Sequence, residues 1–532
     1  MKTITRRSLR VSGRRSQISR DAGTYRGTLS QWRVPKNFHR DSVAHERVVI
    51  QDRASDLYVN DWAARSVVNT LVSNVIGTGL TPQSRLPWRL LGITREEARE
   101  ISTQIEWLWY EWCENCHAKG KLSFSELQRM GFRSVLRDGE MLHVPVANAT
   151  DTRRRFALTI QDVAPERLST PADCLGSPYV RDGIEINDAG QPTYYYIATP
   201  STTLDFVDMR TLTSSSYTRV PAWIAHRRGC FHLFLQEDEE QIRGVSVLSP
   251  AMKLFRHLTD AITHELYGQV AAASMPMVVE TESPTVALPG YVETMTDRNG
   301  EKMYHQNVEA GTLLYLNENE RIKSVESSRP SPNFLNFCEL ILRAVSASVD
   351  LPYEAVLKDF SKTNYSSARA ALLEAWRVYM TYRDWFVGAY CKPIFSMVME
   401  EAYLRGLLVL PQGSADFYEN LKLWTNATWI GPARGYVDPV KEVNANILAH
   451  DAGFKTLTEI ISEQGQDFED VMDTREQEAE RLQRLQKLTA SSSVGSPVGD
   501  PVGSGSPSAT PDAPDDDNND DDTDDGEKEG KD

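Results

Sequence analysis

Cysteine is scarce in this chain, with six residues scattered among 532. So few thiols do not build a disulfide framework, which favours free thiols in a reducing compartment. Long hydrophobic runs are also absent, and none approaches the ~18 residues that a membrane helix needs. The first 20 residues are rich in arginine and lack an apolar core, so they do not resemble a signal peptide. We therefore expect a protein without a membrane segment that is made in a cytoplasm.

The motifs that mark common enzyme sites are missing as well. The sequence has no Walker loop, no H-E-x-x-H, no G-x-S-x-G and no dinucleotide fingerprint, and its ten histidines are dispersed. Gly77-Thr78-Gly79 is a weak phosphate-loop candidate, because it follows a predicted helix and lacks Gly-Lys-Ser/Thr. We predict no catalytic residue, no metal ligand and no cofactor, and a protein that is not an enzyme. A metal-dependent nuclease with dispersed carboxylates stays open as an alternative, because such sites lack local motifs.

Two short patterns have both a chemical and a structural interpretation. Cys113, Cys116 and His117 fit the haem-attachment spacing C-x-x-C-H, but the neighbouring tryptophans indicate a packed core helix. A zinc site would need a second ligand pair at suitable spacing, which the sequence does not offer. Asp138 and Glu140 could form a paired acid site. They flank a glycine at a predicted turn, so we expect them to be solvated side chains.

Charge is distributed unevenly along the chain. The formal net charge is −16, of which residues 491–532 contribute −11 through 13 acidic residues and 2 lysines. The first 20 residues carry +7 and no acid. Segments of this composition do not bury enough apolar surface to offset the entropy of ordering. We expect residues 1–40 to be a basic flexible arm and residues 491–532 to be a disordered acidic tail.

The first half of the ordered chain predicts helices followed by strands. Helical periodicity begins near residue 41 and is interrupted at Asn60-Asp61, where a new helix can be capped. Thr94 and Glu97 form a capping-box pattern in front of a tryptophan-rich helix. Between residues 140 and 234 the apolar pattern alternates with a period of two, in short runs separated by turn residues. This order of helices and strands indicates an α+β domain.

The second half predicts a helix, a strand-rich excursion and further helices. A long helix is expected to start at Ser249, as the N-cap, and Pro250. A second apolar helix should end near Val349, and Ser366 or Ser367 can cap the long helix after the next loop. Pro393 should kink or break that helix. Near the end, Asp438 can cap a helix that begins at Pro439, and Thr456 with Glu459 forms another capping box.

Three stretches carry a resemblance to a known family. LPYEAVLKDFSKTNYSSARAALLE (351–374) is similar to the signature of lambda-type portal proteins of tailed bacteriophages. The stretch RGVSVLSP (243–250) resembles the same family's R-G-x-S-x-L-x-P motif, and residues 428–467 resemble its C-terminal pattern. The resemblance covers roughly residues 40–475, and the two charged ends lie outside it.

The resemblance implies an α+β portal fold, with an α+β wing domain, a two-helix stem, a small α/β clip, a long channel helix and a helical C-terminal crown region. On this chain the expected parts are a basic arm (1–40), the wing (41–246), stem helix 1 (247–275), the clip (276–330), stem helix 2 (331–349), a tunnel loop (350–365), the long helix and second part of the wing (366–425), the crown region (426–490) and the acidic tail (491–532).

The resemblance also implies a function: a dodecamer at one capsid vertex around a channel for packaging and ejection of double-stranded DNA. Such a head–tail connector nucleates head assembly with the major capsid and scaffold proteins. It docks the large subunit of the terminase motor and then the head-completion, neck and tail proteins. Localisation in the virion follows, after a stage in the host cytoplasm. DNA in transit would be bound without sequence specificity, and a net-acidic subunit favours passage because phosphate binding needs Lys and Arg.

Two sets of site residues follow from the implied architecture. Residues of the tunnel loop would face DNA, and their candidates are Lys358, Asp359, Lys362, Asn364 and Arg369. A structural alternative is that the two lysines pair with Asp359 and Glu354 and brace the loop. Candidates for motor and neck docking are the clip acids Glu280, Glu282, Glu293 and Asp297. Another capsid-assembly protein remains an alternative, although a scaffold would be mostly helical, and the strands at 140–234 argue against it.

Overall fold

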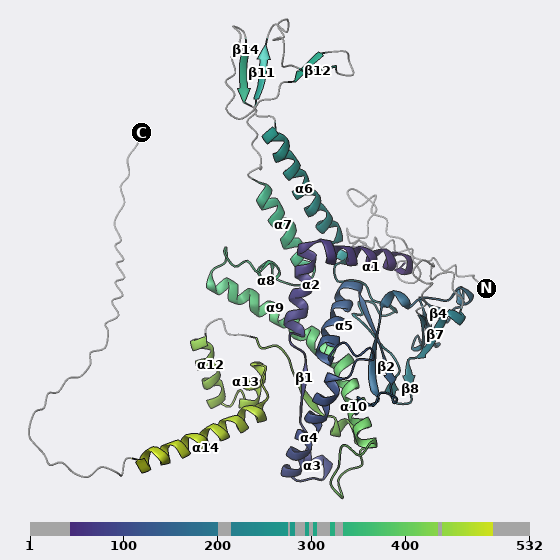
Figure 1. Cartoon of the computed structure of the whole chain (residues 1–532), viewed down its shortest axis with the longest axis vertical. Helices are drawn as coiled ribbons and strands as arrows, with labels where there is room; N and C mark the ends of the chain where they lie inside the picture. Colours follow the sequence, from purple (N-terminus) through teal and green to yellow (C-terminus); the bar gives the residue numbers. More distant parts are fainter. Residues whose placement is uncertain are drawn as a thin grey trace, which may run out of the picture. The chain divides into compact units, whose positions relative to one another are not determined.

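The computed structural model describes residues 43–199, 214–274, 333–434 and 439–492, together with four short strands between residues 277 and 324. The chain divides into two compact units, residues 1–468 and 469–532, of which the second is described only as a helix. Helices and sheets are mixed, as the sequence predicted (Figure 1). None of the described helices is long and apolar enough to cross a membrane.

Five helices open the first unit, and three of them begin at a capping side chain. Asp61 ends the first helix and accepts a hydrogen bond from the backbone N–H of Ala64, which confirms the predicted break. The predicted capping box of Thr94 and Glu97 is present, and Ser123 forms another with Glu126. These helices are α1 (Val43–Asn60), α2 (Trp62–Val75), α3 (Trp88–Leu91), α4 (Arg95–Glu114) and α5 (Phe124–Asp138).

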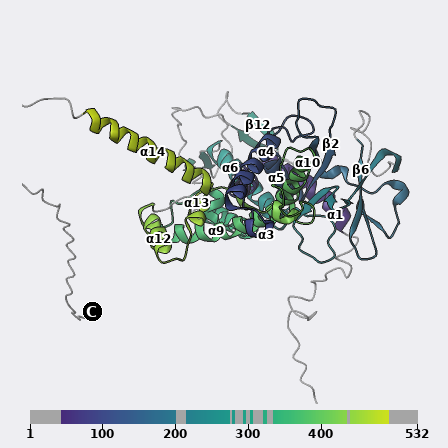
Figure 2. The ribbon, with the colours of Figure 1, turned by 90° about the horizontal axis from the view of Figure 1, so that it is seen from below.

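Two antiparallel sheets follow, as the alternating pattern predicted. The three-stranded sheet has the order β10-β2-β3, from β10 (Phe231–Phe234), β2 (Glu140–Ala147) and β3 (Leu158–Val163). The four-stranded sheet has the order β4-β5-β6-β7, from β4 (Val180–Arg181), β5 (Ile184–Ile186), β6 (Pro192–Ala198) and β7 (Tyr217–Pro221). A small hairpin joins β8 (Trp223–Ile224) and β9 (Arg227–Arg228). Figures 1 and 2 both show β2 between α5 and the four-stranded sheet.

The long helix α6 (Met252–Ser274) starts slightly later than predicted. A 3-10 turn covers Ser249–Ala251, and its N-cap position is Leu248. Ser249 therefore lies inside the first turn and does not cap it, although Pro250 occupies an early helical position as expected. Beyond α6 the described strands are β11 (Met277–Thr281), β12 (Glu293–Thr296), β13 (Lys302–His305) and β14 (Glu320–Ser324).

The chain returns through α7 (Phe334–Ala347), which lies beside α6 in Figure 1 and contacts it. A short helix, α8 (Tyr353–Leu357), precedes α9 (Tyr365–Phe386) and α10 (Lys392–Leu404). Pro393 was predicted to kink or break this long helix. The break is absent, because helical structure continues through Pro393, and the kink stays a prediction. A π-helical turn, Val387–Cys391, stands directly before α10, so the missing N–H of Pro393 falls within a helical N-terminus, where proline is tolerated.

Near the end of the first unit, one strand pairs with a strand from the opening part of the chain, and further helices follow it. Strand β15 (Ala427–Ile430) pairs with β1 (Thr81–Ser84), which is about 350 positions earlier in the sequence, in register Thr81 with Ile430. The predicted capping box of Thr456 and Glu459 is confirmed at α13. Asp438 lies outside the described residues, so its predicted cap stays a prediction. The remaining helices are α11 (Leu421–Trp424), α12 (Pro439–Asp451) and α13 (Leu457–Glu463), with α14 (Phe468–Ser492) in the second unit.

The main core is formed by the opening helices and by α9 and α10. Trp109 contacts Trp112, Phe124 and Phe395 with ring centroids 5.0–5.2 Å apart, and Trp112 is fully buried. A second, smaller core fills the space between the two sheets. Its buried members are Leu142, Val163, Leu168, Ile184, Ile186, Tyr195, Ile197, Ala222 and Cys230. The sheets are therefore attached to the helical body through side-chain packing and, as described below, through buried charge.

Candidate functional site

The segment with the signature sequence, residues 350–364, is an ordered turn between α7 and α9. Its first residue, Asp350, and Lys358 both have positive φ, 55° and 58°, a conformation that non-glycine residues rarely adopt. Lys358 follows directly after α8 and is its C-cap in the left-handed conformation. We call residues 350–364 the 350–364 loop.

One carboxylate on α7 connects this loop to the preceding helix. The Nζ atom of Lys362 donates to Oε2 of Glu339 at 2.7 Å, and Nη2 of Arg343 donates to Oε1 of Glu339 at 2.9 Å. The guanidinium of Arg343 also lies over the ring of Tyr353 on α8, 5.1 Å from its centroid. The hydrogen bonds from Lys362 and Arg343 lower the pKa of Glu339. We call Glu339, Arg343, Tyr353 and Lys362 the loop cluster.

The other predicted loop residues have distinct places. Asn364 is the N-cap of α9, and its side chain accepts from the backbone N–H of Ser367 at 2.8 Å, so the expectation that Ser366 or Ser367 caps this helix is wrong. Asn364 can cap α9 because its backbone is extended and its side-chain oxygen reaches the amide N–H of the third helical residue. Asp359 accepts from the N–H of Ser361 at 3.0 Å.

The cationic candidates differ in their pairing. Lys362 forms its ion pair with Glu339 on α7, and not with Asp359 or Glu354 as the structural alternative predicted. The ion pair nevertheless holds the loop against α7, as that alternative proposed. Lys358 is exposed, and Arg369 is half-buried in the first turns of α9. Neither forms an ion pair with a described acidic residue within 4.0 Å. The structure thus brings Lys362 to α7 and leaves the other two cations without an acidic partner among the described residues.

The most deeply buried charges lie where the three-stranded sheet meets the segment that leads into α6. Glu140, at the start of β2, is fully buried and accepts hydrogen bonds from Arg243 and from His232. The Nε atom of Arg243 lies 2.7 Å from Oε2 of Glu140, and the Nε2 atom of His232 lies 2.8 Å from it. Arg47 of α1 completes the set at 3.7 Å. The expectation that Asp138 and Glu140 are solvated is therefore wrong, since they are 2% and 0% exposed.

Arg243 also ties three loops together through backbone carbonyls. Its Nη1 atom donates to the carbonyl oxygens of Leu168 and Asp182 at 2.8 and 2.6 Å, and its Nη2 atom donates to that of Pro165 at 3.3 Å. The planar guanidinium suits this task because it offers five donors in a fixed geometry. The carboxylate of Asp182 in turn accepts from Arg47 at 2.7 Å.

The glycine after Arg243 is required for close backbone contact. A Cβ atom on Gly244 would lie 2.0 Å from the carbonyl oxygen of Gly139, and one on Gly139 would lie 2.6 Å from the nitrogen of Val245. Ser246 then donates to the carbonyl of Leu136 at 3.1 Å. The R-G-x-S pattern is thus explained by packing at this point. We call Gly139, Glu140, Arg243 and Gly244 the junction, because it joins the sheets to the start of α6.

At the junction, burial shifts the pKa of Glu140 and that of His232 in one direction, and the hydrogen-bonded charged partner of each shifts it in the opposite direction. Burial tends to raise the pKa of Glu140, but the charge and hydrogen bonds of Arg243 outweigh it, so the pKa lies well below its usual range. For His232, burial dominates and lowers the pKa, although the bond to Glu140 acts the other way. Glu140 is therefore ionised at neutral pH, and its charge is compensated mainly by Arg243.

The two cysteines and the histidine of the C-x-x-C-H pattern are buried or half-buried, and they make their contacts with other parts of the protein. The Nδ1 atom of His117 accepts from the backbone N–H groups of Lys121 and Leu122, so Nε2 carries the proton and donates to Asp162 at 2.9 Å. Burial raises the pKa of the Cys116 thiol to about 12 and that of Cys113 well above its ordinary value. Thiols with raised pKa values are poor nucleophiles and poor metal ligands. Among the described residues, no group of three His, Cys, Asp or Glu side chains is placed to hold a metal ion.

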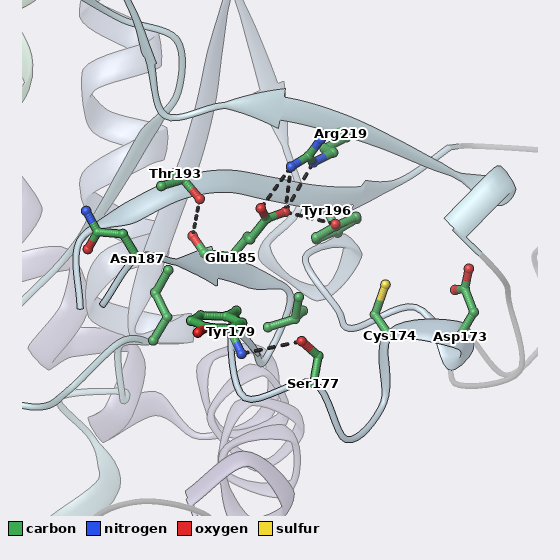
Figure 3. A pocket seen from close by; sticks show the side chains of 11 residues that line it. Asp173, Cys174, Ser177, Tyr179, Glu185, Asn187, Thr193, Tyr196 and Arg219 are labelled. Atoms are coloured by element: carbon green, nitrogen blue, oxygen red, sulfur yellow. Dashed lines mark hydrogen bonds and ion pairs between the residues drawn. The ribbon is translucent and has the colours of Figure 1, made fainter. Parts of the chain in front are cut away.

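An open cavity of about 700 Å³ is lined by side chains of β5, β6 and β7 and of residues 173–180 (Figure 3). Its polar groups bond to one another: Glu185 accepts from Arg219 at 2.8 Å and from the hydroxyl of Tyr196 at 3.0 Å. The side chain of Thr193 donates to the backbone carbonyl of Glu185. Because these groups already satisfy each other, the cavity has the character of a surface depression rather than a built binding site.

The helices α6 and α7 leave large apolar side chains in contact with solvent. The exposed members are Ile262, Leu266, Tyr267, Val270, Leu335, Phe337 and Leu340, with exposed fractions between 40% and 77%. Of the predicted clip acids, Glu282 and Asp297 lie outside the described residues. Glu280 and Glu293 fall in β11 and β12, and their side chains are also outside the described part.

Glu339 and Arg243 were not predicted as site residues. Glu339 and Arg343 are spaced i, i+4 on a helix, which signals a local ion pair. The bond to Lys362 spans 23 residues and has no local signal. For Arg243 the only sequence signal was a charged residue inside a motif, next to a glycine.

Known proteins are similar to this chain over most of its length. Residues 25–383 match the sequence model of the family described as phage portal protein, lambda family. Portal protein B of Escherichia phage lambda is 24% identical over 465 residues, which cover 84% of this chain and 86% of that protein. The portal protein of Escherichia phage N15 is 24% identical over 469 residues, with coverages of 84% and 87%. Among solved structures, a chain in the neck of an empty gene transfer agent (GTA) particle gives a TM-score of 0.43 at 13% identity, covering 77% of this chain and 93% of that chain.

Proposed function

Because the chain belongs to the lambda family of phage portal proteins, which are components of the virion, we propose that it forms a twelve-membered ring at one capsid vertex. The ring would surround the channel through which double-stranded DNA is packaged and ejected. The relatives are structural proteins, and the proposed role needs no catalytic residue or cofactor.

The observation that carries this proposal is the apolar surface of α6 and α7. Leu266 and Tyr267 are 58% and 67% exposed on α6, Val270 one turn later is 60% exposed, and Leu335 on α7 is 77% exposed. Large exposed apolar side chains gathered on neighbouring helices are typical of interfaces. A head-to-tail interface that closes on itself produces a ring. In this proposal α6 and α7 form the stem, and each stem covers the apolar face of the next.

The proposed division of the chain follows the order of its elements. The two sheets and α1–α5 would form the first part of the wing, and the strands β11–β14 would form the clip. Residues 366–425, with α9 and α10, would form the long channel helix and the second part of the wing, and residues 426–490 the crown region. The clip acids Glu280, Glu282, Glu293 and Asp297 would meet the terminase large subunit and later the head-completion and neck proteins. The ring would also contact major capsid and scaffold proteins during assembly in the host cytoplasm.

The 350–364 loop would face the channel. Lys358 and Lys362 supply positive charge in the loop, with Asp359 and Asn364 beside them, and Arg369 adds to it from the first turns of α9. Exposed lysines make salt-screened contacts with phosphates that do not depend on sequence. A ring of such residues could slow the slippage of packaged DNA while allowing it to move.

The ring is tested by changing the exposed stem surface. Leu266→Glu places a charge in the proposed interface and should shift the protein from rings to monomers, measured by light scattering and electron-microscope class averages. Leu175→Glu is the matched control, because Leu175 is 64% exposed in a loop beside the four-stranded sheet. It should leave rings intact. A wild-type protein that stays monomeric at micromolar concentration, or equal behaviour of the two variants, would contradict the proposal.

A further inference from the structure

The loop cluster contains two cations and one carboxylate. Glu339 accepts from Lys362 at 2.7 Å through one oxygen and from Arg343 at 2.9 Å through the other. The side chain of Glu339 is only 18% exposed, whereas those of Lys362 and Arg343 are 69% and 55% exposed. The carboxylate is therefore held close to α7, and the ammonium group of Lys362 reaches back to it from the loop.

We propose that Glu339 is a positioning residue that withholds Lys362 from DNA phosphates and releases it reversibly. This inference rests on the proposed function, because it requires the 350–364 loop to face DNA. In the resting state the ammonium group of Lys362 bonds to Glu339. When a phosphate comes within reach, the ammonium group exchanges one anionic oxygen for another.

The geometry makes this exchange reversible. The pair of Lys362 and Glu339 is exposed on the lysine side, and exposed ion pairs are weak and screened by salt. Departure of Lys362 does not leave the carboxylate unpaired, because Arg343 remains bonded to it on the same helix. Arg343 is itself kept in place by the ring of Tyr353. The loop cluster can thus lose Lys362 without exposing an uncompensated charge.

As a consequence, the proposed channel would bind DNA more weakly than its number of lysines suggests. Lys358 is exposed and makes no ion pair with a described residue within 4.0 Å, so no described carboxylate competes with phosphate for its charge. Lys362 is available only in competition with Glu339. A conduit benefits from this arrangement because permanent phosphate contacts would oppose movement.

The test compares purified rings that carry Glu339→Gln, Lys362→Gln or both changes. Binding of a short fluorescent DNA duplex is measured by anisotropy between 50 and 200 mM salt. Each added phosphate contact steepens the salt dependence by about 0.9 in logarithmic units, which corresponds to roughly threefold in affinity across this range. The slope of Glu339→Gln should be steeper by about 0.9, so its gain in affinity over wild type should be about threefold larger at 50 mM than at 200 mM salt, and Lys362→Gln should bind more weakly than wild type.

The double variant shows whether the effect passes through Lys362. Glu339→Gln should have no effect when Lys362 is already replaced. The matched control is Glu111→Gln, which removes the same charge from an exposed pair with Arg155 at 2.9 Å on α4. It should leave DNA affinity unchanged. An equal gain in the control, or a gain that persists without Lys362, overturns the proposal.

The outcomes also separate this inference from the proposed function. If Lys362→Gln weakens binding while Glu339→Gln matches wild type, the loop faces DNA and the role of Glu339 is refuted. If both match wild type, Lys362 does not contact DNA and the inference fails. Lys358→Gln then tests the loop by itself, and if it also matches wild type, the proposed position of the loop in the channel is refuted.

A measurement on wild-type rings covers the case in which Glu339→Gln rings do not assemble. Duplex DNA should protect Lys362 from an amine-reactive label detected by mass spectrometry. Equal labelling of Lys362 with and without DNA overturns the proposal.

Discussion

Replacing Arg243 with methionine tests the junction, because methionine keeps the apolar length of the side chain and removes its donors. The guanidinium is the main compensating charge for Glu140, which is fully buried. After the change His232 still donates to Glu140, but Arg47 lies at 3.7 Å and cannot replace two close hydrogen bonds. The carbonyls of Leu168 and Asp182 also lose a donor.

The expected cost is large because one member of a buried ion pair is removed. Such changes destabilise proteins by about 3–5 kcal/mol, since a charge stays buried without its partner. The unfolding entropy is about 2.1 cal/mol/K per residue, so a cooperative unit of roughly 400 residues loses about 1 °C in Tm per kcal/mol. We therefore expect Arg243→Met to lower Tm by about 3–6 °C at neutral pH.

The assay is thermal unfolding by circular dichroism at a fixed protein concentration, with ring assembly checked by electron microscopy. Arg219→Met is the matched control, because Arg219 also pairs with a glutamate, at 2.8 Å, but its side chain is 47% exposed. Exposed pairs contribute about 0–1 kcal/mol, so the control should shift Tm by about 1 °C or less. Equal shifts in the two variants would refute the argument that burial makes the junction costly to break.

Three further predictions follow from the same structure. The pKa of Glu140 is depressed in the folded state, so its stabilising contribution is present above its unfolded pKa of about 4.3 and is lost as the pH falls below that value. Glu140→Gln should flatten this acid limb of a Tm-versus-pH curve, and an unchanged limb would contradict the assignment. Asn364→Ala removes the N-cap of α9 and should cost about 1 kcal/mol, measured by urea unfolding, whereas Ser366→Ala should cost less; the reverse order would show that Ser366 is the cap after all. Charge reversal at Glu280, Glu282, Glu293 and Asp297 should spare ring assembly and weaken motor docking in a pull-down with the terminase large subunit, and unchanged docking would remove these residues from the proposed clip surface.

The helix boundaries show what the sequence predicts well. The break at Asp61 and the capping boxes at Thr94 and Thr456 are formed by residues three positions apart. Their hydrogen bonds close within one helical turn, so they depend little on the rest of the fold. The alternating strands between residues 140 and 234 were also correctly predicted, because one face of each sheet packs on a core.

The family assignment came from the sequence too, through motifs whose structural reasons appear only in the fold. The R-G-x-S pattern was predicted as the start of a helix. Its arginine proved to be a buried donor to Glu140, 103 residues away, and its glycine allows contact with the backbone of Gly139. Sequence position alone suggested that Glu140 was solvated, because a charged residue beside a turn glycine usually is.

The sequence by itself determined where most helices and strands lie and to which family the chain belongs. Only the tertiary structure decided which charges meet. Glu140 with Arg243 and Glu339 with Lys362 are joined across 103 and 23 residues by the packing of separate elements. A local pattern specifies hydrogen bonds within one turn of a helix or across a hairpin. The partner of a buried or bridging charge is set by how the apolar faces of separate elements pack against each other. The spacing of residues in the sequence does not specify that packing.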